Sequence, residues 1–132
     1  MKKYNLIAVF NPSMTRWLMC RRRKPPFQGL LNLVGGKIEP GESSGQAAAR
    51  ELFEETGLSG LNLTHVMDLV YHQSGVLLEV FACRLSAPAG VSGDENELMW
   101  VPLRENFFDA EKFAGTGNLG HILAQCLPLF AP

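Results

Sequence analysis

One short stretch of the chain gathers residues that could bind a metal ion. Arg50 is followed within five positions by three glutamates, Glu51, Glu54 and Glu55. At about 100° per residue, a helix places these four side chains within about 140° of one face. Like charges at these spacings repel one another. The pattern is typical either of a solvated face with an Arg50–Glu54 ion pair or of a cradle of hard oxygen ligands for Mg²⁺ or Mn²⁺.

The flanking residues predict the helix that would present these carboxylates. Ser43 or Ser44 can cap the first free amides, and Gln46, three residues after Ser43, completes a capping box. The alanine-rich segment that follows has high helix propensity. Gly57 stands where a left-handed C-terminal cap is expected. We therefore expect a helix over about 43–56.

The spacing of these residues resembles the Nudix box, G-x5-E-x7-R-E-U-x-E-E-x-G-U, where U is aliphatic. Every specified position is matched between Gly36 and Leu58, including Glu42. The resemblance implies an α/β fold, the Nudix α/β/α sandwich with a mixed β-sheet between helices. It also implies Mg²⁺-dependent hydrolysis of a nucleoside diphosphate linked to another group, but it does not define the substrate.

The resemblance also implies roles for the residues of the box. Glu54, Glu55 and the carbonyl of Gly36 would hold one to three Mg²⁺ ions, together with a glutamate further along the chain. Glu51 would position or deprotonate the attacking water, or share in metal binding. Arg50 would orient a glutamate of the box.

The downstream glutamate is expected in the acidic loop of residues 93–97. Acidic loops are most often simply solvated. In many Nudix enzymes, however, a glutamate from this loop is a further metal ligand or the general base. We expect that residue to be Glu97, with Glu95 as the alternative.

Basic residues near the box are candidates for phosphate binding. Arg22 and Arg23 lie in a run of four cations that can equally be a solvated loop. Either guanidinium could meet phosphate oxygens, and the alternation of side chains along a strand leaves open which one does. Lys37, in the loop beside the box, could screen phosphate charge.

Five residues outside the box are candidates for recognising a base. Asn32 lies in a segment similar to the N-x-x-G-G-K of animal oxidised-purine triphosphatases of the MutT type, where the asparagine contacts the base. An amide offers the donor and the acceptor that a purine edge needs. Trp100 could stack on a base or pack in the core. Phe107 and Phe108 could wall a pocket, and Asn118 could cap the last helix or face the base.

Apolar periodicity and turn residues predict the remaining elements. Two-sided burial of 76–85 indicates a central strand covered by helices. The expected strands are 4–10, 16–22, 30–34, 61–71, 76–85 and 98–103, and the expected further helices are 104–113 and 118–130.

Composition limits the kind of protein this can be. With 132 residues and 46% apolar content, we expect one domain over 1–132 and no membrane span. Three dispersed cysteines are typical of reduced thiols in a cytoplasmic protein. A net charge of −1 argues against binding a nucleic-acid polymer. We expect a monomer or homodimer that acts on a small nucleotide.

For the substrate, the sequence favours a (deoxy)nucleoside triphosphate, such as 8-oxo-dGTP, cleaved to the monophosphate and pyrophosphate. The short chain, Asn32 and the aromatic residues support this prediction. The alternatives are ADP-ribose, an NDP-sugar, a dinucleoside polyphosphate, or binding without turnover in a nucleotide-dependent regulator.

Overall fold

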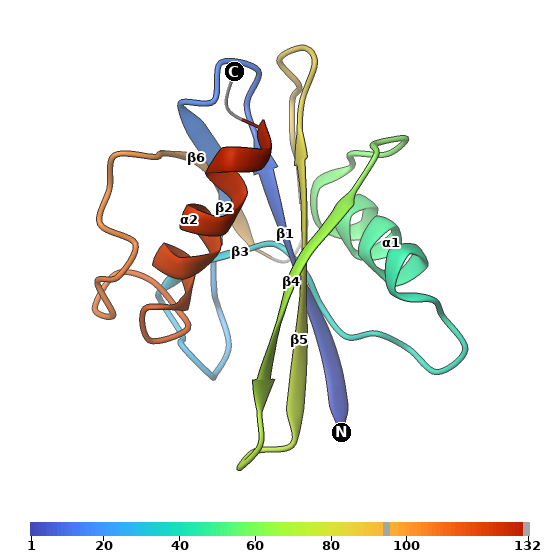
Figure 1. Cartoon of the computed structure of the whole chain (residues 1–132). Helices are drawn as coiled ribbons and strands as arrows, with labels where there is room; N and C mark the ends of the chain where they lie inside the picture. The colour runs from blue at the N-terminus through green and yellow to red at the C-terminus, as the bar shows by residue number, and fades with distance from the viewer. Residues whose placement is uncertain (94–95, 131–132) are drawn as a thin grey trace.

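The chain folds into a mixed β-sheet with one long helix on each face (Figure 1). The computed structural model describes residues 1–93 and 96–130. The elements in chain order are β1 (Lys2–Phe10), β2 (Arg16–Arg21), β3 (Leu31–Leu33), α1 (Ser44–Thr56), β4 (Thr64–Tyr71), β5 (Val76–Arg84), β6 (Glu97–Pro102) and α2 (Asn118–Phe130).

The sheet is built around β1 and β5, which run parallel along their whole lengths. The strand order is β3-β2-β1-β5-β4, and β6 pairs with β2. All the other strand pairs are antiparallel. The prediction that 76–85 is an interior strand is confirmed, since β5 lies between β1 and β4.

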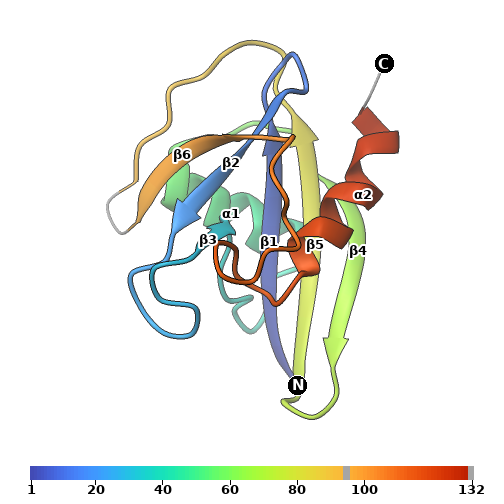
Figure 2. The same ribbon diagram turned by 90° about the vertical axis from the view of Figure 1, so that its left-hand side faces the viewer.

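The sheet divides after β1. The first two strands pair only where Phe10 meets Trp17, and β2 then turns away to pair with β3 and β6 (Figure 2). The chain beyond β3 rejoins β1 through bridges from Val34 to Ile7 and from Lys37 to Tyr4. The segment that leads into α1 therefore runs beside the first half of β1.

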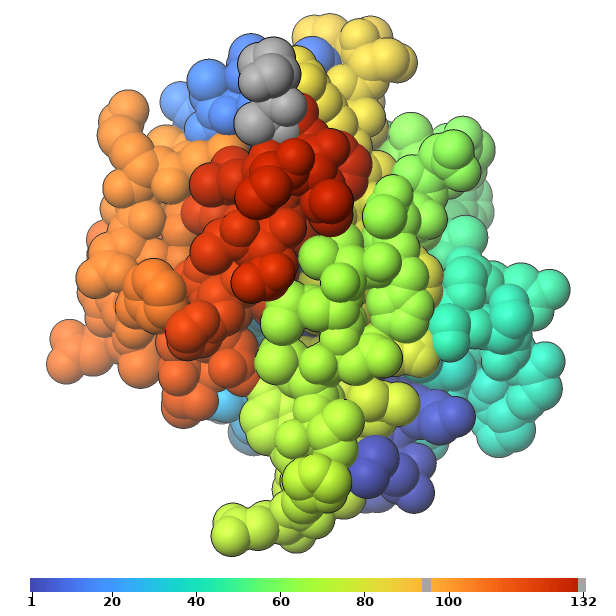
Figure 3. Space-filling model, viewed as in Figure 1, coloured from blue at the N-terminus to red at the C-terminus, as the bar shows by residue number. Residues whose placement is uncertain are grey.

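Two apolar clusters fill the space between the sheet and the helices. Alternate residues of β1 divide between them: Ile7 and Val9 face α1, whereas Ala8 and Phe10 face α2. Figure 3 shows α2 lying along β4 on one face of the molecule.

No helix in the described part of the chain is long and apolar enough to span a bilayer.

The start and end of α1 are as the sequence predicts. The side chain of Ser43 accepts a hydrogen bond from the Gln46 amide, and the Gln46 side chain accepts one from the Ser43 amide. Gly57 has the left-handed conformation, and its N–H donates to the carbonyl of Phe53. These local contacts fix where the helix begins and ends.

Two predicted elements are wrong in extent or type. Residues 104–113 form turns rather than a helix, because the side chains of Asn106 and Asp109 accept hydrogen bonds from the amides of Phe108 and Glu111. The strand predicted over 61–71 begins only at Thr64.

Candidate active site

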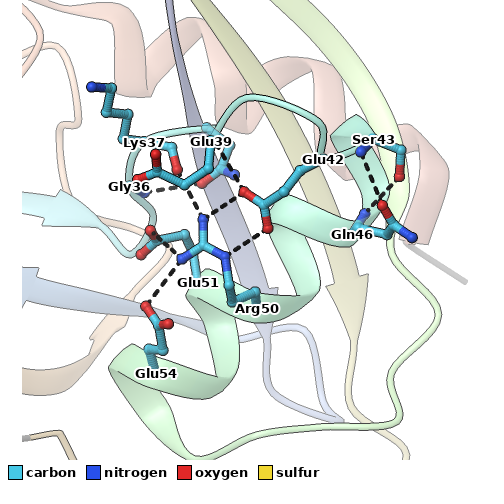
Figure 4. Close-up of polar contacts among 10 residues, drawn as sticks. Gly36, Lys37, Glu39, Glu42, Ser43, Gln46, Arg50, Glu51 and Glu54 are labelled. Carbon is cyan, nitrogen blue, oxygen red and sulfur yellow. Dashed lines mark hydrogen bonds and ion pairs between the residues drawn. The ribbon is translucent and has the colours of Figure 1, made fainter.

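Arg50 is the centre of the polar network on α1 (Figure 4). Its guanidinium donates to both carboxylate oxygens of Glu42, at 2.7 and 2.8 Å. The same group reaches Glu51 at 3.0 Å and Glu54 at 3.2 Å, and also donates to the carbonyl of Lys37 at 3.0 Å. One cation thus fixes three carboxylates and the loop that precedes the helix.

Glu42 holds Arg50 in place. The hydrogen bonds from Arg50 and from the Glu39 amide lower the pKa of Glu42 to about 2. Both of its oxygens are therefore occupied by donors from the chain. Its contacts make Glu42 the partner that orients Arg50.

Glu51 lies against the backbone of Gly36. A Cβ at position 36 would collide with the Glu51 carboxylate, so any other residue there would push this carboxylate aside. The Glu51 side chain is only 13% exposed. Burial raises the pKa of Glu51, and Arg50 opposes that rise. The Glu51 carboxylate is therefore largely buried between Arg50 and the glycine loop.

The other two glutamates of the box extend the acidic face of α1. The Glu54 side chain is 56% exposed and contacts the same Arg50 nitrogen as Glu51. Glu55 lies near enough to Cys20 of β2 for its charge to act on that thiol. Burial raises the pKa of the Cys20 thiol to about 11, and the negative charge of Glu55 adds to that rise. The acidic face therefore extends from Arg50 toward β2.

These carboxylates are of the type that a hard divalent cation prefers. Glu51 and Glu54 converge on a single Arg50 nitrogen, and carboxylate oxygens are the ligands that Mg²⁺ and Mn²⁺ prefer. Within residues 1–93 and 96–130, no three His, Cys, Asp or Glu side chains are arranged so that they could together hold a metal ion.

Two further groups are predicted to bind the metal ion, the carbonyl of Gly36 and the side chain of Glu97. The carbonyl oxygen of Gly36 accepts a hydrogen bond from the backbone N–H of Asn5 at 2.8 Å. One lone pair of that oxygen is therefore used within the sheet. Glu97 begins β6 and is exposed, with its carboxylate 3.7 Å from Arg21. Glu95 lies outside the described residues. The downstream ligand remains a prediction.

The basic candidates are arranged differently from one another. Arg22 donates from Nε to the carbonyl of Pro26 at 2.6 Å and so closes its own loop. Its charge also acts on Cys20, where it lowers the pKa of the thiol. Arg23 is exposed. The side chain of Lys37 extends away from Arg50 into solvent, as Figure 4 shows.

Asn32 lies on the same sheet face as the box. It is the cross-strand neighbour of Cys20, which belongs to the apolar cluster under α1. Side chains that are directly opposite on neighbouring strands share a face. The Asn32 side-chain oxygen accepts a hydrogen bond from the Leu33 amide at 2.9 Å, and the residue is partly exposed. Asn32 and Cys20 therefore lie together on the sheet face that α1 covers.

The aromatic candidates do not form one pocket. Phe107 is 2% exposed and packs against Trp17 and Phe113, so the prediction that it walls a pocket is wrong. Burial in the core beneath α2 is the physical reason. Phe108 is 54% exposed and stacks edge-on against His121, also on the α2 side.

The remaining two candidates, Asn118 and Trp100, do not lie together either. The amide of Asn118, at the start of α2, donates to the hydroxyl of Tyr71. Trp100 packs on the α1 side of the sheet and lines a surface hollow of about 530 Å³ with Arg16 and Leu85. None of the residues lining this hollow belongs to the box. The predicted specificity residues are thus divided between the two faces of the sheet.

Sequence reasoning missed a residue that supports the box from β1. Asn5 is 1% exposed, and its side-chain oxygen accepts a hydrogen bond from the Gly36 amide at 2.9 Å. A polar residue inside the apolar run of 4–10 is the signal that could have found it, because a buried amide needs hydrogen-bond partners.

Comparisons with known proteins agree on one family. The family model of the NUDIX domain matches residues 2–123. An oxidized purine nucleoside triphosphate hydrolase from Danio rerio is 30% identical over 113 residues, which cover 84% of this chain and 68% of that protein. The chain spans between 17% and 68% of the lengths of the curated relatives it matches.

Solved structures share the fold. MutT from Aliivibrio salmonicida and Vibrio cholerae, described together, aligns with a TM-score of 0.73 at 20% identity and covers 98% of both chains. The NUDIX domain of Shewanella oneidensis NrtR, solved with ADP ribose, aligns with a TM-score of 0.77 at 16% identity, covering 98% of this chain and 88% of that one. At these identities the likeness concerns the fold.

Proposed function

The chain belongs to the Nudix family, and on this premise we propose that it is a pyrophosphohydrolase that cleaves a nucleoside triphosphate to the monophosphate and pyrophosphate. The observation that carries the proposal is that Asn32 lies on the same face of the sheet as α1, the helix that carries the glutamates of the box. One face of the sheet thus offers carboxylates for the phosphate end of a substrate and an amide for its base.

Three carboxylates of α1 would hold Mg²⁺ or Mn²⁺: Glu51, Glu54 and Glu55. When bound, the cation supplies positive charge that offsets the charge developing on phosphate oxygens. Arg50 keeps Glu51 and Glu54 aimed at a common point through its Nη1. Because Glu42 occupies the rest of the guanidinium fork, Arg50 is itself held in a single orientation.

The reaction joins water to phosphorus and releases the pyrophosphate. Glu51 accepts a proton from the water, which then forms the new P–O bond while the bond to the leaving oxygen breaks. Glu97 is the alternative base. Arg22 and Arg23 meet the phosphates at the edge of the site.

An oxidised purine is the favoured base. The Asn32 amide offers a donor and an acceptor to a purine edge. A relative whose alignment covers 84% of this chain carries the name oxidized purine nucleoside triphosphate hydrolase. The structural likeness to a domain solved with ADP ribose supports ADP-ribose as the second candidate, either as substrate or as a bound regulator.

A substrate panel tests the proposal. Hydrolysis of 8-oxo-dGTP, dGTP, ADP-ribose and an NDP-sugar is followed with Mg²⁺ and again with Mn²⁺. We expect the highest kcat/KM for 8-oxo-dGTP. Faster turnover of ADP-ribose would replace the favoured substrate, and tight ADP-ribose binding without any turnover would instead support a regulator.

A further inference from the structure

Two buried polar side chains lie together beneath the N-terminus of α1. Asn5 on β1 is 1% exposed, and Glu79 on β5 is 5% exposed. They are direct partners in the parallel pairing of the two strands. Both lie on the α1 face, because alternate residues of each strand, including Ile7 and Phe81, belong to the cluster under that helix.

Asn5 holds the loop that enters the box. Its side-chain oxygen accepts a hydrogen bond from the Gly36 backbone N–H at 2.9 Å, and its backbone N–H donates to the Gly36 carbonyl at 2.8 Å. A Cβ on Gly35 would collide with the Asn5 carbonyl, and one on Gly36 would collide with Glu51. The two glycines are therefore confined between Asn5 on one side and the Glu51 carboxylate on the other.

Glu79 holds the beginning of the helix that carries the box. The hydroxyl of Ser44, the first residue of α1, donates to one Glu79 carboxylate oxygen at 2.8 Å. A buried carboxylate at this end of a helix is also favoured by the helix dipole. Glu79 thus links the central sheet to the start of α1.

The remaining polar atoms of the pair complement each other. Asn5 Nδ2 and Glu79 Oε1 are both buried, and neither has a hydrogen-bond partner in the described part of the chain. The Gly36 amide is a donor, which assigns the oxygen of Asn5 to that side and leaves its NH₂ group for the other. A buried donor and a buried acceptor on adjacent strand positions are suited to a single bridging water.

We infer that Asn5 and Glu79 form one water-bridged link that positions the Gly35–Gly36 loop and the start of α1 relative to each other, and so sets the place of the Glu51 carboxylate. Neither residue touches the reacting atoms, so both are positioning residues. The link runs from Ser44 through Glu79 and Asn5 to Gly36. The catalytic part of this inference rests on the proposed hydrolysis.

Exchanging the two functional groups tests the link. In N5D, the new carboxylate still accepts from Gly36 but faces the carboxylate of Glu79, and the two repel in a buried site. E79Q has a milder effect, because its amide can turn its oxygen toward Asn5 and its NH₂ toward the Ser44 hydroxyl. In N5D/E79Q, the glutamine amide donates to the bridging water and the water donates to the aspartate, so the link is restored with its polarity reversed.

We expect N5D to lower kcat by about 10- to 100-fold with KM nearly unchanged, as is typical when support for a metal-binding carboxylate is removed. The double variant regains most of that loss. The same rescue is expected in the midpoint of urea unfolding and in the exchange protection of the Gly36 amide, measured by NMR. Equal damage by N5D in the wild-type and E79Q backgrounds would overturn the inference.

Val9→Ala is the matched control. Val9 is fully buried on the same strand and face as Asn5, so its truncation weakens packing without touching the link. It is expected to lower the unfolding midpoint and leave kcat unchanged well below that midpoint. A comparable loss of kcat in Val9→Ala would reduce the effect of N5D to general destabilisation and contradict a positioning role.

The stability and exchange measurements separate this inference from the proposed function. A wild-type chain that turns over no nucleotide defeats the proposed function, yet the rescue in unfolding midpoint and Gly36 protection still decides whether the link exists. A chain that hydrolyses its substrate but shows no rescue retains the proposed function and loses the link.

Discussion

At the scale of single residues, the shape of the Arg50 guanidinium decides how the box is held. Its fork contacts Glu42 with two hydrogen bonds and still reaches Glu51 and Glu54. A lysine ammonium keeps the charge but cannot make the paired contact. Arg50→Lys is expected to lower kcat by about 10- to 100-fold in a steady-state assay.

The control for this variant is Arg84→Lys. Arg84 also uses its guanidinium fork, on the carbonyls of Pro12 and Phe130, but none of these contacts involves the box. Its replacement should leave kcat nearly unchanged. Equal losses in the two variants would show that Arg50 stabilises the fold without orienting the carboxylates.

A pair of asparagines tests where the base lies. Asn32 is on the α1 side of the sheet, whereas Asn118 contacts Tyr71 on the α2 side. Asn32→Ala is expected to reduce the preference for 8-oxo-dGTP over dGTP by about tenfold, since a bidentate base contact contributes about 1–3 kcal/mol. Asn118→Ala should leave the preference intact. The reverse result would place the base against α2.

At this scale the sequence predicts the members of the box better than their contacts. Spacing identifies Arg50 and the glutamates on one helix face. It does not reveal that Glu42, eight residues before Arg50, is the main partner of that arginine. That pairing depends on how the loop of residues 36–42 folds back over the helix, which no local rule determines.

At the scale of elements, α1 depends on its N-terminal cap. Ser43 and Gln46 exchange hydrogen bonds that satisfy two amides at the start of the helix. Ser43→Ala is expected to lower the free energy of unfolding by about 1 kcal/mol, measured by urea denaturation. Ser59→Ala, in an exposed loop after the helix, is the control and should change it by less than about 0.5 kcal/mol. A cap variant as stable as the control would contradict the assigned role.

The elements that the sequence predicts best are those with strong local signals. The helix over 43–56 has a capping box and a C-terminal glycine, and the structure reproduces both. The helix expected over 104–113 does not form, because Phe107 and Phe113 are buried beneath α2 and asparagine and aspartate turns satisfy the backbone. Long-range burial outweighs helical propensity there.

At the scale of the whole molecule, all three cysteines are buried and free. Burial raises the pKa of the Cys20 and Cys83 thiols to about 11 and that of Cys126 to about 12. Few thiolates therefore form near neutral pH, and the native protein should react slowly with Ellman's reagent, whereas the unfolded chain should release three equivalents of the coloured product. Fast reaction of the native protein would contradict this burial.

The same thiols predict how stability varies with pH. The unfolded chain loses these protons near the ordinary thiol pKa of 9.0, whereas the native protein keeps them to about 11 or 12. Their contribution to stability is therefore complete below pH 9 and is lost as pH rises toward 11–12. Urea unfolding across this range should show a falling midpoint, and a Cys126→Ala variant should show a smaller pH-dependent fall.

The central claim is that the carboxylates on α1 make the molecule a metal-dependent pyrophosphohydrolase of nucleoside triphosphates. Its most direct test follows the products from 8-oxo-dGTP by ³¹P NMR in the presence of Mg²⁺, with wild-type protein and with Glu54→Gln. The account predicts a nucleoside monophosphate and pyrophosphate from the wild type, and a rate at least about 100-fold lower from the variant. No cleavage by the wild type, or equal cleavage by the variant, would contradict it.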